Sequence, residues 1–76
     1  MLVPVREDVQ VRCEAGAPMR VVWRGERWRV IDRPTRQESG LWEAWRFTAR
    51  SDRDERTVIL DVEAVDGRWA LTAAFE

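Results

Sequence analysis

Arginines and tryptophans alternate between residues 20 and 33, and together they have the chemistry of a nucleic-acid-binding surface. The arginines are Arg20, Arg24, Arg27, Arg29 and Arg33. Guanidinium groups bind phosphates, and the rings of Trp23 and Trp28 are of the kind that stacks on bases. The same residues also suit one half of a hydrophobic core with a solvated outer face. Which of the two holds depends on the elements that position these side chains.

No combination of residues in the chain points to catalysis. The chain has no histidine, so neither a Cys–His nor a Ser–His pair can form, and Cys13 is its only cysteine. Residues 51–56 place Asp52, Asp54 and Glu55 in one loop, but without the glycine and the distal glutamate of a calcium loop. Arginines between these carboxylates would repel a cation. We therefore expect no enzymatic activity, no metal, no cofactor and no small-molecule substrate.

The composition limits the value of the arginines as a binding signal. All thirteen basic residues are arginine, lysine is absent, and the net charge of the 76-residue chain is −1. This pattern is typical of a high-GC genome, and a net charge near zero gives no global attraction to nucleic acid or to a membrane. No apolar run approaches the roughly 18 residues of a membrane span, and the N-terminus does not resemble a signal peptide. We expect a cytoplasmic protein.

The opening stretch predicts a β-hairpin. Apolar and charged residues alternate on both sides of Gly25-Glu26, which fits a two-residue type II′ turn. In this register both tryptophans point inward and the arginines point outward, so the base-stacking interpretation loses its aromatic rings. The expected cross-strand pairs are Arg24 with Arg27, Trp23 with Trp28, and Val21 with Val30.

The last third of the chain predicts a second β-hairpin around Asp66-Gly67, a pair that favours a type I′ turn. The expected pairs there are Ala64 with Trp69, Val62 with Leu71, Leu60 with Ala73, and Val58 with Phe75. In the first strand Cys13 alternates with valines, which predicts a buried thiol.

The whole pattern predicts an all-β protein. Its fold is a single small antiparallel meander of five or six strands, curled into a barrel or a half-barrel that buries its one apolar face. Residues 1–76 form one domain, in which residues 1–8 are expected to be a loose N-terminal arm. The expected strands are 9–13, 19–24, 27–33, 42–49, 57–65 and 68–75.

Three apolar residues are candidates for an interface. The period of its strand puts Trp42 on the face opposite Trp45, where it either caps an open end of the barrel or lies exposed. With Val22 and Ile31 it would form an apolar patch beside arginines, a composition typical of interfaces. We therefore expect a protein-interaction or self-association module, such as a homodimer. The alternative is a nucleic-acid-binding module that uses the five arginines.

The strand at 57–65 also presents an acidic outer face. Asp61 and Glu63 alternate with inward valine and alanine. They either pair with arginines of neighbouring strands or make the domain bipolar, which would favour head-to-tail association. Pairing within the domain is the preferred interpretation.

Three segments resemble a family of short bacterial β domains of unknown function. They are PMRVVWRGERWRV, WEAWRF and VILDVEAVDGRWALTAAFE. The matching positions are Pro18, Trp23, Arg24, Gly25, Arg27, Arg29, Val30, Gly67, Arg68 and Trp69. Trp28 stands where tyrosine is usual, Glu26 replaces a basic residue, and residues 70–74 are smaller than typical. The resemblance implies a protein of a high-GC bacterium, with a translesion DNA polymerase of the Y family or its accessory proteins as the partner.

Overall fold

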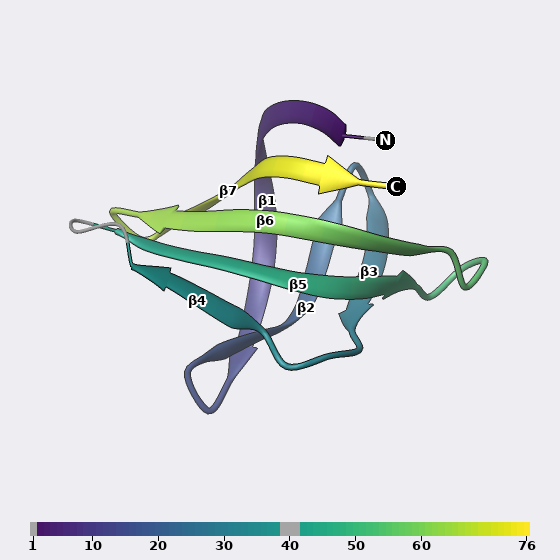
Figure 1. Ribbon diagram of the computed structural model, residues 1–76, viewed down its shortest axis with the longest axis horizontal. Coiled ribbons are helices and arrows are strands. Elements are labelled where there is room, and N and C mark those ends of the chain that lie inside the picture. Colours follow the sequence, from purple (N-terminus) through teal and green to yellow (C-terminus); the bar gives the residue numbers. More distant parts are fainter. Residues whose placement is uncertain (1, 39–41) are drawn as a thin grey trace.

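The computed structural model of the protein describes residues 2–38 and 42–76, and all their regular structure is antiparallel β-strand. The strands are β1 (Leu2–Glu14), β2 (Ala17–Trp23), β3 (Glu26–Val30), β4 (Thr35–Glu38), β5 (Glu43–Ser51), β6 (Thr57–Val65) and β7 (Arg68–Phe75). Their order is β3-β2-β1-β7-β6-β5-β4, and a further pairing of β3 with β5 closes six of them into a small barrel (Figure 1). The predicted all-β meander that curls into a barrel is confirmed.

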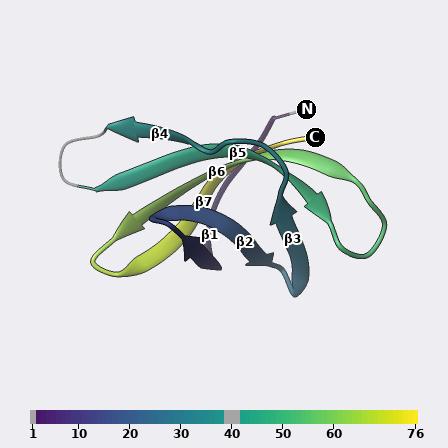
Figure 2. The same cartoon turned by 90° about the horizontal axis from the view of Figure 1, so that it is seen from below.

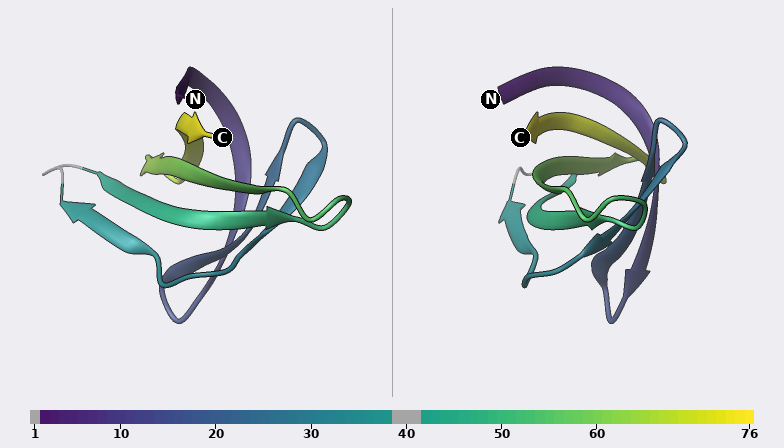
Figure 3. Two further views of the ribbon diagram at one scale, coloured as in Figure 1. Left: turned by 45° about the vertical axis from the view of Figure 1, so that its right-hand side comes forward. Right: turned by 90° about the vertical axis from the view of Figure 1, so that its right-hand side faces the viewer.

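β1 joins the two halves of the barrel. Its residues 2–9 pair with β7 and its residues 10–14 pair with β2, so the strand bends over the barrel between them. Figure 3 shows this curved strand above the ends of β7. The expectation of a loose arm is therefore wrong for residues 2–8, because their backbone forms the ladder that covers the edge of β7. Residue 1 lies outside the described residues.

Three tight turns share one backbone geometry. In each, a residue with a φ of 51–52° precedes a glycine with a φ of 76–80°: Ala15-Gly16, Arg24-Gly25 and Asp66-Gly67. Positive φ at both central positions is the mark of the type I′ turn, whose twist matches that of the strands. The turn predicted at Asp66-Gly67 is thus confirmed.

The first hairpin differs from its prediction by one residue in the turn. Arg24-Gly25 occupies the turn rather than Gly25-Glu26, so Trp23 pairs with Glu26 and Val21 pairs with Trp28. Glycine fits the second position of a type I′ turn as well as the first position of a type II′ turn. The predicted cross-strand pairs of this hairpin are therefore wrong. The tryptophans still point inward. Moving the turn by one residue changes the cross-strand partner of each residue by two positions, and a change of two leaves every side chain on the same face.

The barrel is filled by its own aromatic and branched side chains. Trp28, Phe47, Leu60, Leu71 and Val62 are 2% exposed or less. The Trp23 and Trp28 rings lie 6.2 Å apart at 38°, and both are buried. The interpretation of these two tryptophans as core residues is confirmed.

Besides an irregularity in β1 between Pro4 and Glu7, two bulges change which residues face outward. In β2, Arg12 pairs with Arg20 but Cys13 pairs with Pro18, so Met19 is the extra residue and is exposed. Cys13 is exposed as well, so its predicted burial is wrong. In β7 the extra residue is Thr72, since Leu71 pairs with Val62 and Ala73 pairs with Asp61.

The bulge at Thr72 separates the predicted pairs of the last hairpin that are confirmed from those that are wrong. The two nearest the turn, Ala64 with Trp69 and Val62 with Leu71, are confirmed. Beyond Thr72 the register moves by one residue, so Leu60 pairs with Ala74 and Ile59 with Phe75. The other two predicted pairs are wrong because a bulge adds a residue to one strand only.

β4 is one strand more than the sequence pattern predicted. The predicted strand 27–33 ends earlier, at Val30, because Asp32 Oδ1 accepts the hydrogen bond of the Thr48 amide at 2.9 Å. Pro34 follows, and it has no amide hydrogen to donate. The chain then re-forms a ladder with the first half of β5, and in Figure 2 β4 lies beside that part of β5.

Candidate nucleic-acid interface

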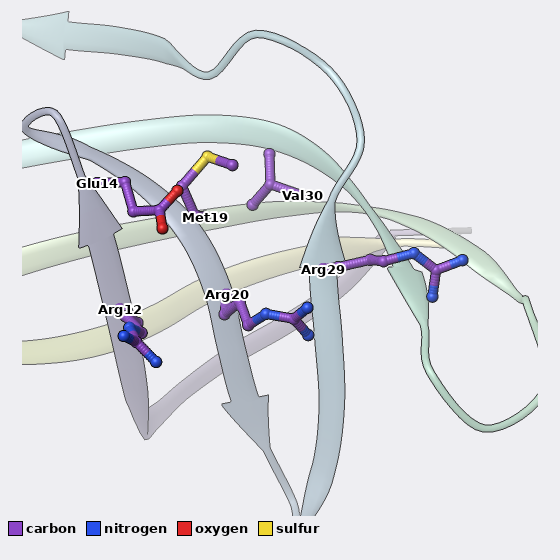
Figure 4. Close-up of a pocket in the computed structure, with 6 residues that line it drawn as sticks. All are labelled: Arg12, Glu14, Met19, Arg20, Arg29 and Val30. Atoms are coloured by element: carbon purple, nitrogen blue, oxygen red, sulfur yellow. The ribbon is translucent and has the colours of Figure 1, made fainter.

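Four arginines stand opposite one another on four strands that are adjacent in the barrel: β1, β2, β3 and β5. Arg12 pairs with Arg20, Arg20 with Arg29, and Arg29 with Arg50. We call Arg12, Arg20, Arg29 and Arg50 the arginine row. Figure 4 shows its first three members side by side on β1, β2 and β3. Like charges directly opposite in a sheet destabilise it, so this alignment costs stability.

Two carboxylates of the β5–β6 loop lie against the arginine row. Asp52 Oδ2 accepts a hydrogen bond from Arg20 Nη1 at 3.2 Å, and Asp52 Oδ1 accepts one from Arg29 Nη1 at 2.9 Å. Glu55 Oε2 accepts from Arg29 Nη2 at 2.7 Å and lies 3.7 Å from Arg50 Nε. These bonds, that of Asp52 first, raise the pKa of Arg29. Three guanidinium groups of the row thus contact two carboxylates, and Arg12 makes no ion pair with a described side chain, so the row keeps an excess of positive charge.

The β5–β6 loop is held in this position by a second network behind it. Ser51 is fully buried, and its hydroxyl donates a hydrogen bond to Glu26 Oε2. Arg56 Nη2 donates to the same oxygen at 2.8 Å, and its guanidinium lies 5.5 Å from the centre of the Trp28 ring. The hydrogen bond from Ser51 and the nearby Arg56 lower the pKa of Glu26. Glu26 therefore anchors the loop through Ser51 and Arg56.

The structure brings together only part of the predicted arginine face. Arg20 and Arg29 belong to the row, and Arg27 lies on the same face two residues from Arg29. Arg24 lies in the turn, where its Nε and Nη2 donate to Glu7 at 2.9–3.1 Å and its guanidinium covers Trp23. Arg33 lies in the link between β3 and β4.

Sequence reasoning missed the two ends of the row. Arg12 alternates with inward valines, which already predicted an outward side chain, but its strand register was not predicted. Arg50 was placed one residue beyond the end of its strand. Arg12 and Arg27 make no ion pair with any side chain that the structure describes, whereas Arg20 and Arg29 do.

Two surface hollows lie along the arginine row. The first, of about 370 Å³, is lined by Arg12, Glu14, Met19, Arg20, Arg29 and Val30 (Figure 4). The second, of about 520 Å³, is lined by Gln10, Val11, Arg12, Arg20, Val21, Val22, Arg27, Trp28 and Asp52. Arg12 and Arg20 line both. Arg12, Arg20 and Arg29 of the row therefore border space that is open to a ligand, whereas Arg50 lines neither hollow.

The three residues predicted as an apolar interface do not meet. Trp42 and Ile31 are 42% and 41% exposed, and Val22 is half-buried. Ile31 lies opposite Thr48, to whose carbonyl it donates a hydrogen bond, whereas Trp42 lies just before β5, six residues or about 20 Å of extended chain from Thr48. Val22 pairs with Arg27, on the other side of the arginine row from Ile31.

A different apolar row runs parallel to the arginines. Ile31 stands opposite Thr48, Thr48 pairs with Ile59, and Ile59 pairs with Phe75. Ile59 is 39% exposed, and the guanidinium of Arg46 lies 4.9 Å from the centre of the Phe75 ring. The pairing of Ile59 with Phe75 depends on the bulge at Thr72, so the sequence pattern did not predict this apolar row.

The acidic outer face of β6 is paired within the domain. Asp61 accepts two hydrogen bonds from Arg46, at 2.7 and 2.9 Å, and Glu63 accepts one from Arg6 at 2.6 Å. The preferred interpretation of these two carboxylates is confirmed, since each has an arginine partner within the domain: Arg46 on the adjacent β5, and Arg6 on β1, which lies beyond β7.

Cys13 and the described carboxylates are the remaining candidates for a chemical site. Partial burial, and then the charge of Glu43, raise the pKa of the Cys13 thiol, which lowers its nucleophilicity at neutral pH. Within residues 2–38 and 42–76, no three histidine, cysteine, aspartate or glutamate side chains cluster closely enough to hold a metal ion. The described segments also contain no helix long and apolar enough to cross a membrane.

Comparison with known proteins adds no further assignment. The chain matches no protein-family model, no curated protein and no solved structure. The resemblance described for the tryptophan-rich segments therefore stays a prediction, and the candidate site rests on the geometry of the arginine row.

Proposed function

We propose that the protein is a non-catalytic binding module whose arginine row holds the phosphate backbone of a nucleic acid. The observation that supports this most directly is the position of Asp52. Its carboxylate bridges Arg20 and Arg29, so two guanidinium groups on neighbouring strands converge on one oxyanion. A phosphate presents oxygens to the same donors in the same way.

The energetic cost of the row supports the same proposal. Arginines directly opposite one another repel, and Asp52 and Glu55 offset that repulsion only in part. A sheet selected for stability alone would place opposite charges or uncharged residues at these positions. Arg27 adds a further positive charge beside the row.

The proposal is tested by titrating a labelled duplex of about 20 base pairs with the protein at low salt, using fluorescence anisotropy. The double substitution Arg20→Gln with Arg29→Gln removes two phosphate contacts and is expected to weaken binding by roughly ten-fold or more. The matched control is Arg36→Gln with Arg68→Gln, which makes the same charge change at exposed positions on β4 and β7. Equal losses in the two variants would count against the arginine row.

A second candidate function, protein interaction or self-association, is favoured by the exposed apolar row. Ile31 and Ile59 are each about 40% exposed and face the same side of the barrel. Among the described strands, β4 is at the end of the sheet and pairs only with β5, so its other edge is open to a partner strand. The resemblance described above would make a translesion polymerase or its accessory proteins the partner.

Light scattering distinguishes this candidate from the first. Wild type is compared with Ile59→Arg, which places a charge in the apolar row, and with Trp42→Ala. Association that Ile59→Arg abolishes and Trp42→Ala leaves intact would locate the interface on the apolar row. A wild-type protein that is monomeric at all concentrations would remove self-association.

A further inference from the structure

Among the residues that line the two hollows along the arginine row, the one aromatic ring is that of Trp28, which is buried. Trp23, Trp28 and Trp45 point into the barrel and are only 7%, 2% and 9% exposed. The residues beside the row are aliphatic or polar, since Val22 stands between Gln10 and Arg27. Proteins that bind single strands combine a basic groove with exposed aromatics, and base stacking gives them about 1–3 kcal/mol per base. That contribution is missing from the two hollows as far as their residues are described.

The exposed Trp42 is distant from the Arg50 end of the row. Trp42 lies just before β5 and Arg50 lies near the end of that strand, eight residues later, which corresponds to about 25 Å along an extended strand. A nucleotide bound at Arg50 therefore cannot stack on its ring. Binding at the row therefore depends on phosphates.

The dimensions of the row favour a ligand of high charge density. Four neighbouring strands span three inter-strand gaps, about 14 Å in all. Over that length a duplex carries roughly eight phosphates on its two strands and a single strand carries roughly four, so the duplex has the higher charge density. Half of the charge on the row is offset by Asp52 and Glu55, so the denser ligand competes better with these carboxylates.

We infer that the ligand of the arginine row is double-stranded nucleic acid, held by its phosphate backbone without reading of the base sequence. This inference rests on the proposed function and specifies its substrate class. Phosphate contacts fix the position of a protein on a duplex but contain no sequence information. Three or four such contacts imply that affinity falls about 40- to 150-fold between 50 and 200 mM salt.

The test compares labelled ligands on the wild-type protein by fluorescence anisotropy. The probes are two 20-base-pair DNA duplexes of unrelated sequence and a 20-nucleotide oligo-dT strand, which has no secondary structure. Both duplexes are expected to bind with equal affinity, on the order of ten-fold tighter than the single strand, and with the salt dependence given above. Arg12→Gln, at the end of the row that makes no ion pair with a described side chain, should reduce that salt dependence by about one phosphate contact, while Arg68→Gln should not.

The possible outcomes separate the inference from the function on which it rests. If oligo-dT binds as tightly as the duplexes or more tightly, the inference of a duplex ligand is overturned while phosphate binding at the row survives. A clear preference for one of the two duplexes overturns the sequence-independent part. If no probe binds even at 50 mM salt, the proposed function fails together with the inference. Circular dichroism on each variant shows that a loss of binding is not a loss of fold.

Discussion

Arg29 donates a hydrogen bond from Nη1 to Asp52 Oδ1 at 2.9 Å, and through this contact the β5–β6 loop places a carboxylate against the arginine row. The two residues come from different hairpins and meet because β3 and β5 close the barrel. Asp52 therefore occupies the position at which a phosphate oxygen would contact the same guanidinium. The Asp52 carboxylate would affect ligand affinity in two opposite ways. It orients Arg29 for binding, and it competes with a ligand for the same guanidinium group.

Removal of this carboxylate is expected to strengthen binding. Asp52→Asn keeps the shape of the side chain but removes one negative charge from the row, and a partly exposed ion pair of this kind is worth about 0–1 kcal/mol. The affinity for a DNA duplex should rise roughly two- to five-fold, measured by anisotropy at constant salt. Asp66→Asn makes the same charge change in the distant β6–β7 turn and serves as the control. A fall in affinity for Asp52→Asn would mean that orienting the arginines matters more than competition.

The stability of the barrel should depend on its interior and little on its apolar outer row. Leu71 is fully buried, so Leu71→Ala is expected to lower the free energy of unfolding by about 2–5 kcal/mol through lost packing and a cavity. Ile59 is 39% exposed, and Ile59→Ala should cost about 1 kcal/mol or less. Urea unfolding followed by tryptophan fluorescence measures both. Similar losses for the two substitutions would contradict the assignment of Ile59 to the outer face.

The turn between β1 and β2 contains an alanine in a backbone conformation that does not suit it. Ala15 has a φ of 51°, a conformation that costs an ordinary L-residue roughly 1–2 kcal/mol and that asparagine tolerates better. Ala15→Asn should therefore raise the free energy of unfolding by about 0.5–1 kcal/mol, seen as a higher thermal midpoint. Gly16→Ala, at a φ of 80° in the same turn, should lower it. An unchanged or lower thermal midpoint for Ala15→Asn would show that the backbone conformation of Ala15 does not reduce the stability of the protein.

Acid should loosen the β5–β6 loop through Glu26. The hydrogen bond from the Ser51 hydroxyl, assisted by Arg56, lowers the pKa of Glu26 below its ordinary value of 4.5. A depressed pKa means that the charged form is favoured by folding, so its contribution is complete above pH 4.5 and is lost as the pH falls through the folded value. Urea unfolding between pH 7 and pH 3 should show a stability advantage of wild type over Glu26→Gln that disappears at the acid end. An advantage that persists at pH 3 would refute this role of the Glu26 charge.

The alternation of residue types predicted which side chains fill the barrel. Trp23 and Trp28 were expected inside, and they remain inside although the hairpin turn was placed one residue too late. This part is robust because side chains in a strand alternate between two faces, and a change of register by two residues leaves every face unchanged. Asp66-Gly67 was predictable for a related reason, since the conformation of a two-residue turn depends on the residues within it.

Bulges and the interruption of β3 depend on groups that are distant in the sequence. Thr72 becomes an extra residue between positions that pair on either side of it, and this changes the partner of Phe75. Asp32 ends the β3 ladder because its carboxylate accepts the amide of Thr48, sixteen residues away. Neither the bulge at Thr72 nor the end of β3 can be recognised from the residue types or the alternation pattern of the local sequence. The predicted strand bounds and pairs were wrong at these points.

The sequence by itself determined that this protein is an all-β meander with its tryptophans inside and its arginines outside. Only the tertiary structure decided that Arg12, Arg20, Arg29 and Arg50 form one row. The row requires the register of two hairpins and the closure of β3 onto β5, which brings together residues 21 positions apart. The physical reason is that a period of two fixes the face of each side chain, while the neighbour across the sheet is fixed by turns, bulges and barrel closure.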